Sequence, residues 1–184
     1  SAIPITNEWN SYLRQACREL GIHRLVTLAE STLITTPVVI GYLKPVILTP
    51  VGMFTGLSSE QLQTIILHEL AHIRRHDYLI NLVQSVIETI LFFNPFIWSI
   101  STIIRKEREY CCDDLVVRHH GDARAYAYAL TLLAENKLSG HAFALSLAED
   151  RNQLLHRIKR IMKTSATNHT LKNRIIIPLI LLSA

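Results

Sequence analysis

The chain has 184 residues, about the length of one domain with a sizeable core. Hydrophobic residues make up 49% and charged residues 18%, which excludes an intrinsically disordered protein, while 6 Gly, 6 Pro and 3 Cys exclude collagen-like and disulfide-rich classes. The net charge is +4 and no aromatic residues interleave with the basic clusters, so we expect no nucleic-acid partner. A mean hydropathy of +0.22 is high for a freely soluble protein and leaves a surplus of apolar residues to be placed.

The first fifty residues predict a helix followed by a small sheet. Apolar residues recur on one face from Asn7 to Leu20, and Gly21 stops this helix. Short β-branched or apolar runs at 25–28, 33–40 and 45–48 are separated by glycine and proline, a pattern typical of edge strands. The chain opens without the pattern of a secretory signal peptide, and we expect it to be part of a longer protein.

A second helix is predicted over residues 58–76. Ser58 and Gln61 have the spacing of a capping box, and apolar residues then recur at helical period.

The segment 78–104 is almost entirely apolar and long enough to cross a bilayer. Because Asn94 and Pro95 predict a break with a new helix start, we expect two helices, at 78–93 and 95–119. The first of them carries a narrow polar stripe formed by Asn81, Gln84, Ser85 and Glu88. Its apolar surface either lies in the core of this domain or packs on lipid or on membrane helices outside this chain.

Further helices are predicted at 122–137 and 149–162, followed by a polar segment at 163–174. Residues 175–184 carry no charge and are typical of the start of a truncated transmembrane helix, with a terminal strand as the alternative. Basic residues just before them would place the preceding domain in the cytoplasm: Lys159, Arg160, Lys163, Lys172 and Arg174. The expected fold is α+β and mainly helical, with a small sheet before a metal-binding helix and a bundle of helices after it.

The strongest chemical signal is the run from His68 to His72, which reads HELAH. Histidines four residues apart on a helix lie one turn above each other, so both imidazoles can bind one zinc ion. Glu69 is turned about 100° away, where its carboxylate can act as general base on a water. The alternative is a surface helix with two histidines and an incidental acid.

A catalytic zinc needs a third protein ligand. A third histidine ten residues after His68 is absent, because that position is Tyr78, and His76 fits no such spacing. A glutamate on a later helix, followed four residues on by an aspartate, is the other arrangement, and Glu109 with Asp113 supplies it.

In this arrangement Glu109 binds zinc and Asp113 accepts a hydrogen bond from the far ring nitrogen of a ligand histidine, expected to be His68. Glu107 is a weaker candidate because its partner position is Cys111, and Asp114 is the second choice after Asp113. Charge partners for these carboxylates are expected nearby, namely Arg105 and Arg108. The alternative for this stretch is a solvated charged face.

Taken together, four runs resemble the integral-membrane zinc metallopeptidases of the BlaR/MecR type, β-lactam sensor-transducers in the wider gluzincin-like group. These runs are PVVIGYLKPVILTP, GLSSEQLQTIILHELAHIRRHDYLINL, NPFIW and REREYCCDD, and the resemblance covers about residues 37–117. It implies a peptidase domain at 1–174 on the cytoplasmic side of the cell membrane, anchored by flanking transmembrane helices. His68, His72 and Glu109 then match the zinc ligands, Glu69 the catalytic acid/base and Asp113 the carboxylate behind a ligand.

The implied reaction is hydrolysis of peptide bonds in a protein or peptide substrate, with a repressor-type regulatory protein as the expected target. A further hydrogen-bond donor to the oxyanion is usual, and His76, Tyr110 and Arg75 are the candidates. The region 33–48 either adds an extended substrate as a strand or is a plain structural sheet. No penicillin-binding sensor motif is present, so the inducing signal does not carry over, and the sequence does not set the oligomeric state.

Two other functions remain open from the sequence. One is a zinc-containing signalling scaffold whose site is latent or inactive, although an intact Glu69 disfavours it. The other is a membrane zinc peptidase of the prenyl-protein-processing or quality-control type, which shares the same two-part site.

Overall fold

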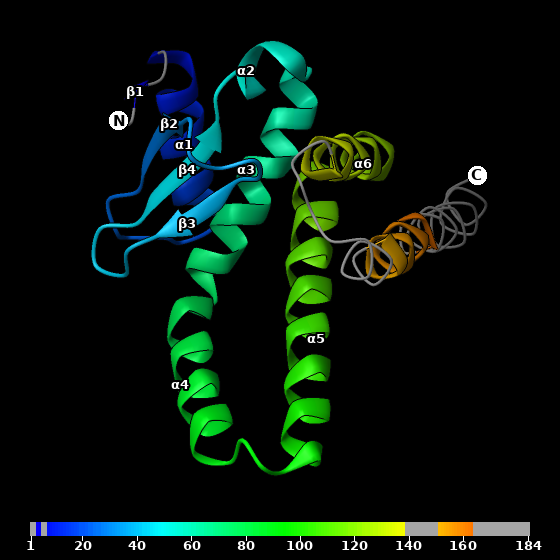
Figure 1. Cartoon of the computed structure of the whole chain (residues 1–184). Helices are drawn as coiled ribbons and strands as arrows, with labels where there is room; N and C mark the ends of the chain where they lie inside the picture. The colour runs from blue at the N-terminus through cyan, green and yellow to red at the C-terminus, as the bar shows by residue number, and fades with distance from the viewer. Residues whose placement is uncertain (1–2, 5–6, 139–150, 164–184) are drawn as a thin grey trace, which may run out of the picture.

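The computed structural model describes residues 3–4, 7–138 and 151–163 (Figure 1). All but the first residue of the expected polar segment at 163–174, and the whole expected membrane-helix start at 175–184, lie outside this range. Within it, helices dominate and a small sheet precedes them, so the predicted α+β, mainly helical fold class is confirmed.

The sheet has four strands in the order β1-β2-β4-β3. These are β1 (Ile3–Pro4), β2 (Thr27–Ser31), β3 (Val38–Ile40) and β4 (Val46–Pro50), and only β2 and β4 run parallel. In register, Leu28 faces Ile47, and both side chains lie in the core.

Two predicted strand ranges were wrong. The strand expected at 25–28 lies at 27–31, and the one expected at 33–40 is reduced to β3. Turns fill the gap between them, ahead of Pro37, which has no N–H for a ladder. The pairing of β2 with β4 fixes the register, and this contact is not visible in the pattern of one strand.

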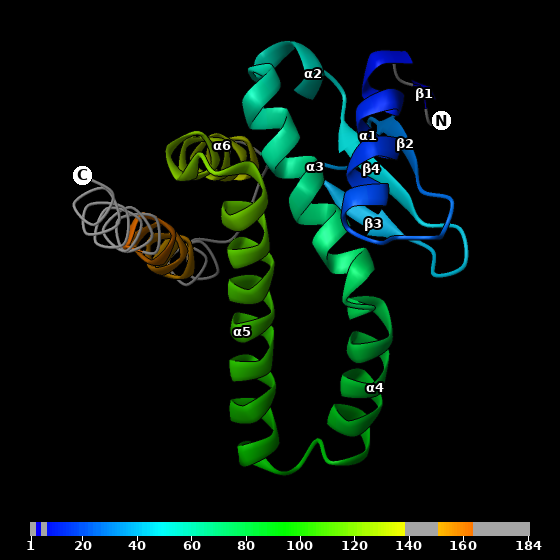
Figure 2. The ribbon, with the colours of Figure 1, turned by 180° about the vertical axis from the view of Figure 1, so that it is seen from behind.

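Helix α1 (Asn7–Glu19) covers one face of the sheet, as the two opposite views show (Figures 1 and 2). The short helix α2 (Met53–Gly56) was not predicted and leads into α3 (Ser59–Arg74). The predicted capping box of α3 is present, with the Gln61 N–H donating to Ser58 Oγ at 3.3 Å and the Ser58 N–H to Gln61 Oε1 at 2.9 Å. The helix begins where the sequence predicts.

Helix α3 ends two residues earlier than predicted. The backbone of His76 has φ of 58°, in the left-handed region that residues other than glycine seldom adopt. The chain changes direction there and enters α4 (Asp77–Ile90). His76 is therefore held in a strained backbone conformation at the edge of the site.

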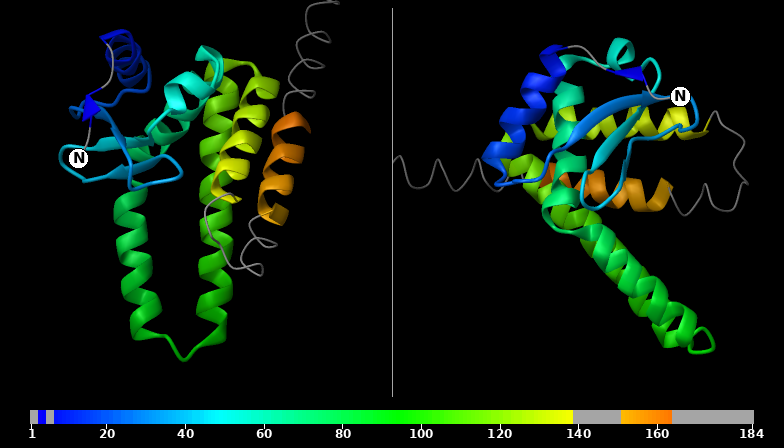
Figure 3. Two further views of the ribbon diagram at one scale, coloured as in Figure 1. Left: turned by 45° about the horizontal axis from the view of Figure 1, so that its top comes forward. Right: turned by 90° about the vertical axis from the view of Figure 1, so that its left-hand side faces the viewer.

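Helices α4 and α5 (Pro95–His120) form a long hairpin that projects from the rest of the molecule (Figure 3). The predicted break is confirmed, because Asn94 Oδ1 accepts from the Phe96 N–H at 3.0 Å and Pro95 occupies the first turn. Most apolar side chains of this hairpin are exposed, so of the two alternatives that the sequence left open, burial in the core of the domain is the one that the structure contradicts. None of the described helices is both long and apolar enough to cross a membrane.

The C-terminal half of α5 packs beside α6 (Ala123–Leu138) and a further helix at 151–163 (Figure 3). Asp122 caps α6, with its Oδ1 accepting from two backbone N–H groups at 2.8 and 3.0 Å. The main core lies among α1, the sheet, α3, α5 and α6, and its largest fully buried side chain is Tyr126. Helix α3 therefore runs through the centre of the domain.

Candidate metal centre

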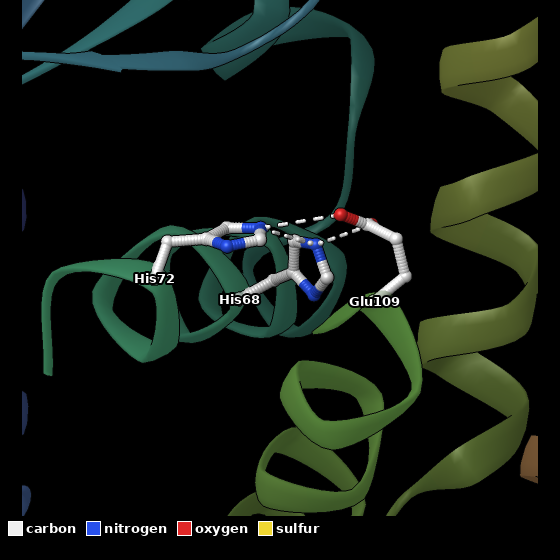
Figure 4. Close-up of side chains that lie close together, drawn as sticks. All are labelled: His68, His72 and Glu109. Carbon is white, nitrogen blue, oxygen red and sulfur yellow. Dashed lines mark hydrogen bonds and ion pairs between the residues drawn. The ribbon is translucent and has the colours of Figure 1, made fainter. Parts of the chain in front are cut away.

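His68 and His72 of α3 and Glu109 of α5 converge on one point (Figure 4). The two Nε2 atoms lie 3.2 Å apart. Glu109 Oε2 lies 3.5 Å from His68 Nε2, and Glu109 Oε1 lies 3.8 Å from His72 Nε2. The one-turn spacing on α3 and the packing of α5 against it thus bring the three expected ligands together.

The far ring nitrogens of both histidines have oxygen partners. His72 Nδ1 lies 2.7 Å from Asp77 Oδ2, and a carboxylate only accepts, so Nδ1 carries the proton. His68 Nδ1 lies 2.8 Å from the hydroxyl of Tyr126, which donates its own proton to Asp113 Oδ1 at 2.5 Å and so accepts from His68. Both Nε2 lone pairs are left to face Glu109, the arrangement that metal-binding histidines need.

Asp113 lies behind His68, as expected, but its closer contact is with the hydroxyl of Tyr126, which lies between it and the His68 ring. Its Oδ1 is 3.5 Å from His68 Nδ1, farther than Tyr126. Arg157, on the helix at 151–163, donates to both oxygens of Asp113 at 2.7 and 2.9 Å and lies 3.0 Å from Glu109 Oε2. Asp114 pairs instead with Arg160, at 2.8 Å.

Arg105 and Arg108 are not the charge partners of these carboxylates, and that expectation was wrong. Arg105 pairs with Glu88, and Arg108 donates to Gln84 Oε1 at 2.9 Å, so both lie against α4. The partners come from the helix at 151–163, which joins the site through packing that the sequence pattern does not show.

The donor set fits a bound cation. Three ligand atoms that accept hydrogen bonds face one another, and they repel unless a cation or a proton lies between them. In the metal-free chain, protons on the imidazoles take the place of the cation. Burial opposes the charged form of His72, yet hydrogen bonds with Asp77 and Cys112 raise its pKa to about 11. Burial also opposes ionisation of Glu109, yet the hydrogen bond and charge of His68 and the charge of Arg157 lower its pKa to about 2. The surroundings therefore favour positive charge at this point.

A second group of possible ligands, His72, Asp77 and Cys112, lies behind the first. Cys112 is fully buried, and burial raises the pKa of its thiol, so the proton that a metal would have to displace stays in place near neutral pH. Its Sγ lies 3.7 Å from Asp77 Oδ2 and 3.5 Å from His72 Nδ1. This group is suited to hold His72 rather than an ion.

The convergent residues open into a pocket of about 720 Å³, which Glu69 also lines. Of the three candidate donors, His76 lines this pocket, whereas Arg75 and Tyr110 are not among its lining residues. Tyr110 instead lies under the guanidinium of Arg160, with 5.0 Å from its ring centroid to the guanidinium carbon. The pocket thus brings together a general-base candidate, three ligand candidates and one donor candidate.

Three residues of the site were not expected from the sequence. Asp77 had a signal in the sequence, because it follows His72 by five residues, close to where the predicted helix at 58–76 ends. Tyr126 and Arg157 lie 58 and 44 residues from their partners His68 and Asp113, so only the packing of α6 and the last described helix reveals them.

Comparison with known proteins identifies the family. A family model described as BlaR1 peptidase M56 matches residues 4–161. The regulatory protein BlaR1 of Bacillus licheniformis is 29% identical over 155 residues, covering 83% of this chain and 25% of that protein. The methicillin resistance mecR1 protein of Staphylococcus aureus is 31% identical over 93 residues, covering 50% of this chain and 16% of that protein.

The chain therefore spans a quarter or less of the length of these relatives. The match favours their family over the prenyl-protein-processing and quality-control peptidases that the sequence also allowed. It extends well beyond the four motifs, from β1 into the helix at 151–163. The chain belongs to the BlaR1 peptidase M56 family.

Proposed function

We propose that this chain is the zinc endopeptidase domain of a membrane-anchored signal transducer and that it cleaves a regulatory protein of the repressor type. The observation that carries the proposal is the convergence of His68, His72 and Glu109 in one pocket that Glu69 lines. Membership of a peptidase family supports hydrolysis of peptide bonds as the reaction. The printed names of the relatives, a regulatory protein and a resistance protein, support a role in signalling.

Zinc is the proposed metal because two imidazoles and one carboxylate are a catalytic zinc set that leaves a position open. His68, His72 and Glu109 would hold it, and Asp77 and Tyr126 would orient the two imidazoles. When bound, zinc would supply Lewis acidity, which lowers the pKa of water toward neutrality and polarises a peptide carbonyl.

Glu69 is the proposed general base. It lies next to His68 on α3, so its side chain leaves the helix about 100° away from that ligand, and it lines the same pocket. From there its carboxylate takes a proton from the attacking water and passes it to the leaving amine. The carboxylate is thus a proton carrier and not a ligand.

His76 is the proposed donor to the developing oxyanion. Arg24 Nη2 lies 2.6 Å from His76 Nδ1, and a guanidinium only donates, so Nδ1 accepts. The neutral ring then carries its proton on Nε2, where it can donate to an oxygen in the pocket. The contact with Arg24 holds the His76 ring where it lines the pocket.

The substrate is proposed to bind in extended form along β3. This strand lies at the end of the sheet order, and its Val38 and Val39 line the pocket. An edge strand offers backbone N–H and C=O groups to which a peptide can add as a further strand. Peptide bonds in a flexible segment of the target would reach the site in this way.

The proposal is tested by incubating the zinc-loaded 184-residue chain, in lipid or detergent, with a peptide library. We expect cleavage that a chelator abolishes and that zinc restores. Glu69→Gln should abolish cleavage while zinc stays bound, whereas Glu60→Gln, an exposed glutamate in the first turn of the same helix, should cleave normally. Cleavage that survives both the chelator and Glu69→Gln would overturn the proposal, and absence of cleavage with zinc bound would favour a scaffold.

A further inference from the structure

The hairpin formed by α4 and the first part of α5, residues 77–107, has its apolar side chains on the outside. At its tip, Phe92, Phe93 and Phe96 are 68%, 70% and 74% exposed. Along its sides, valine, leucine and isoleucine residues of both helices are also exposed, among them Leu82, Val83, Val86, Ile100 and Ile103. Exposed apolar side chains gathered on one projecting element are typical of a surface that contacts a membrane or another protein.

Several polar side chains of the same hairpin lie in the seam between its two helices, among them the buried Gln84 and Ser101. Gln84 Nε2 donates to the Ser101 carbonyl at 3.0 Å, and Arg108 Nη2 donates to Gln84 Oε1 at 2.9 Å. Glu88, the one charged residue between positions 78 and 104, pairs with Arg105 across the seam. Polar groups thus pair between the helices while apolar side chains face outward, which is the reverse of the pattern in a water-soluble helical hairpin.

The turn at the tip pairs several of its backbone groups internally. The Leu91 N–H donates to the Ile87 carbonyl at 2.9 Å, and the Asn94 N–H donates to the Leu91 carbonyl at 2.9 Å. The Asn94 side chain accepts from the Phe96 N–H, and Trp98 Nε1 donates to the Phe92 carbonyl at 2.8 Å. In water these groups could bond to solvent, but in hydrocarbon each unpaired one costs several kcal/mol.

We infer that this hairpin inserts tip-first into a lipid bilayer and returns to the same side, with the metal centre at its base next to the membrane surface. A bilayer fits better than a protein groove, because both helices expose apolar side chains and the hairpin stands clear of the rest of the molecule (Figures 1 and 3). The 14 residues of α4 extend about 21 Å, which enters a hydrocarbon core about 30 Å thick without crossing it.

Basic residues flank the apolar stretch at both ends, with Arg74 and Arg75 before it and Arg105 and Lys106 after it. Because α4 and α5 run in opposite directions, the start of α4 and the later part of α5 both lie away from the tip, on the side of the headgroups (Figure 1). Anionic headgroups would therefore strengthen binding. This contact goes beyond anchoring by flanking transmembrane helices, since it belongs to the peptidase domain itself and does not depend on its activity.

The two tryptophans of the chain make the inference directly testable, because Trp98 lies in the hairpin and Trp9 lies in α1. Trp9→Phe and Trp98→Phe each leave one emitter in the 184-residue chain. In vesicles of phosphatidylcholine and phosphatidylglycerol with brominated acyl chains, we expect Trp98 emission to shift to the blue and lose most of its intensity. Trp9 emission should stay unchanged.

Two matched double variants test whether the tip of the hairpin makes the membrane contact, through their effect on the strength of vesicle binding. Phe92→Ser/Phe93→Ser should weaken partitioning into these vesicles roughly a hundredfold. Leu25→Ser/Leu33→Ser removes two side chains that are equally exposed, at 70% and 86%, but lie outside the hairpin, and should leave partitioning unchanged. Vesicle binding without quenching of Trp98 would assign the contact to another segment and overturn the inference. Failure to bind protein-free vesicles would overturn it in favour of a protein partner.

Discussion

Asp77 fixes the orientation of His72 through the 2.7 Å contact with Nδ1, so it decides where the Nε2 lone pair points. We expect Asp77→Asn to weaken zinc affinity by roughly 10- to 100-fold, because the amide keeps the shape but loses the charge that supports the ligand. Competition against a chromophoric chelator measures this change. Glu107→Gln, which removes an exposed carboxylate from α5, is the control, and equal affinities in the two variants would contradict this role of Asp77.

Tyr126 connects His68 to the buried carboxylate of Asp113 and is itself fully buried. Tyr126→Phe leaves the His68 Nδ1–H without its acceptor, so we expect the free energy of unfolding to fall by about 1–3 kcal/mol. Denaturant unfolding of the metal-free chain measures it. Tyr128→Phe, an exposed hydroxyl two residues along the same helix, should change stability by less than about 0.5 kcal/mol. Equal losses of stability in the two variants would contradict a role for the Tyr126 hydroxyl between His68 and Asp113.

Among the helices and strands, the stability of the expected metal-binding helix α3 depends on the capping of its first turn as well as on its packing. Ser58 accepts from the Gln61 N–H and so satisfies one of the free donors of the first turn. Ser58→Ala should lower the free energy of unfolding by about 1 kcal/mol, as thermal or denaturant unfolding would measure. Ser59→Ala, at the adjacent exposed position inside the helix, is the control and should not destabilise the chain. A loss as large for Ser59→Ala would show that the loss is not specific to the cap at Ser58.

The sequence predicts helices better than strands in this chain, for a physical reason. Capping residues and apolar period are local, so the starts of α3 at Ser58 and of α5 at Asn94 are predicted correctly. Strand limits depend on a partner, and β2 owes its extent to pairing with β4, which lies beyond the residues that form β3. The end of α3 was missed because His76 adopts a left-handed conformation that its residue type does not announce.

In the candidate site, too, features that depend on local spacing could be predicted, whereas tertiary contacts could not. The pairs His68 with His72 and Glu109 with Asp113 could be predicted because helical spacing determines which side chains of one helix share a face. The choice of Glu109 as third ligand came from a known arrangement of zinc ligands. Tyr126 and Arg157 could not, because they reach Asp113 only once α6 and the helix at 151–163 pack against α5. The sequence therefore predicts the expected ligands, and the tertiary structure adds the residues that orient them.

For the molecule as a whole, the apolar surplus and the polar site are two parts of one arrangement. A mean hydropathy of +0.22 would be unusual if every apolar residue served the core, but a large share of them lies on the hairpin of α4 and α5. The pocket lies where that hairpin meets the domain, since residues from both ends of it, such as Asp77 and Arg105, line the pocket. A substrate cleaved there would be bound close to the surface that the hairpin contacts.

The claim on which this account rests is that His68, His72 and Glu109 hold one metal ion. X-ray absorption at the zinc edge of the loaded 184-residue chain tests it most directly. We predict one zinc per chain with only nitrogen and oxygen neighbours, at about 2.0–2.2 Å. A sulfur neighbour at about 2.3 Å would place the ion at Cys112 instead, and a chain that binds no zinc would contradict the account altogether.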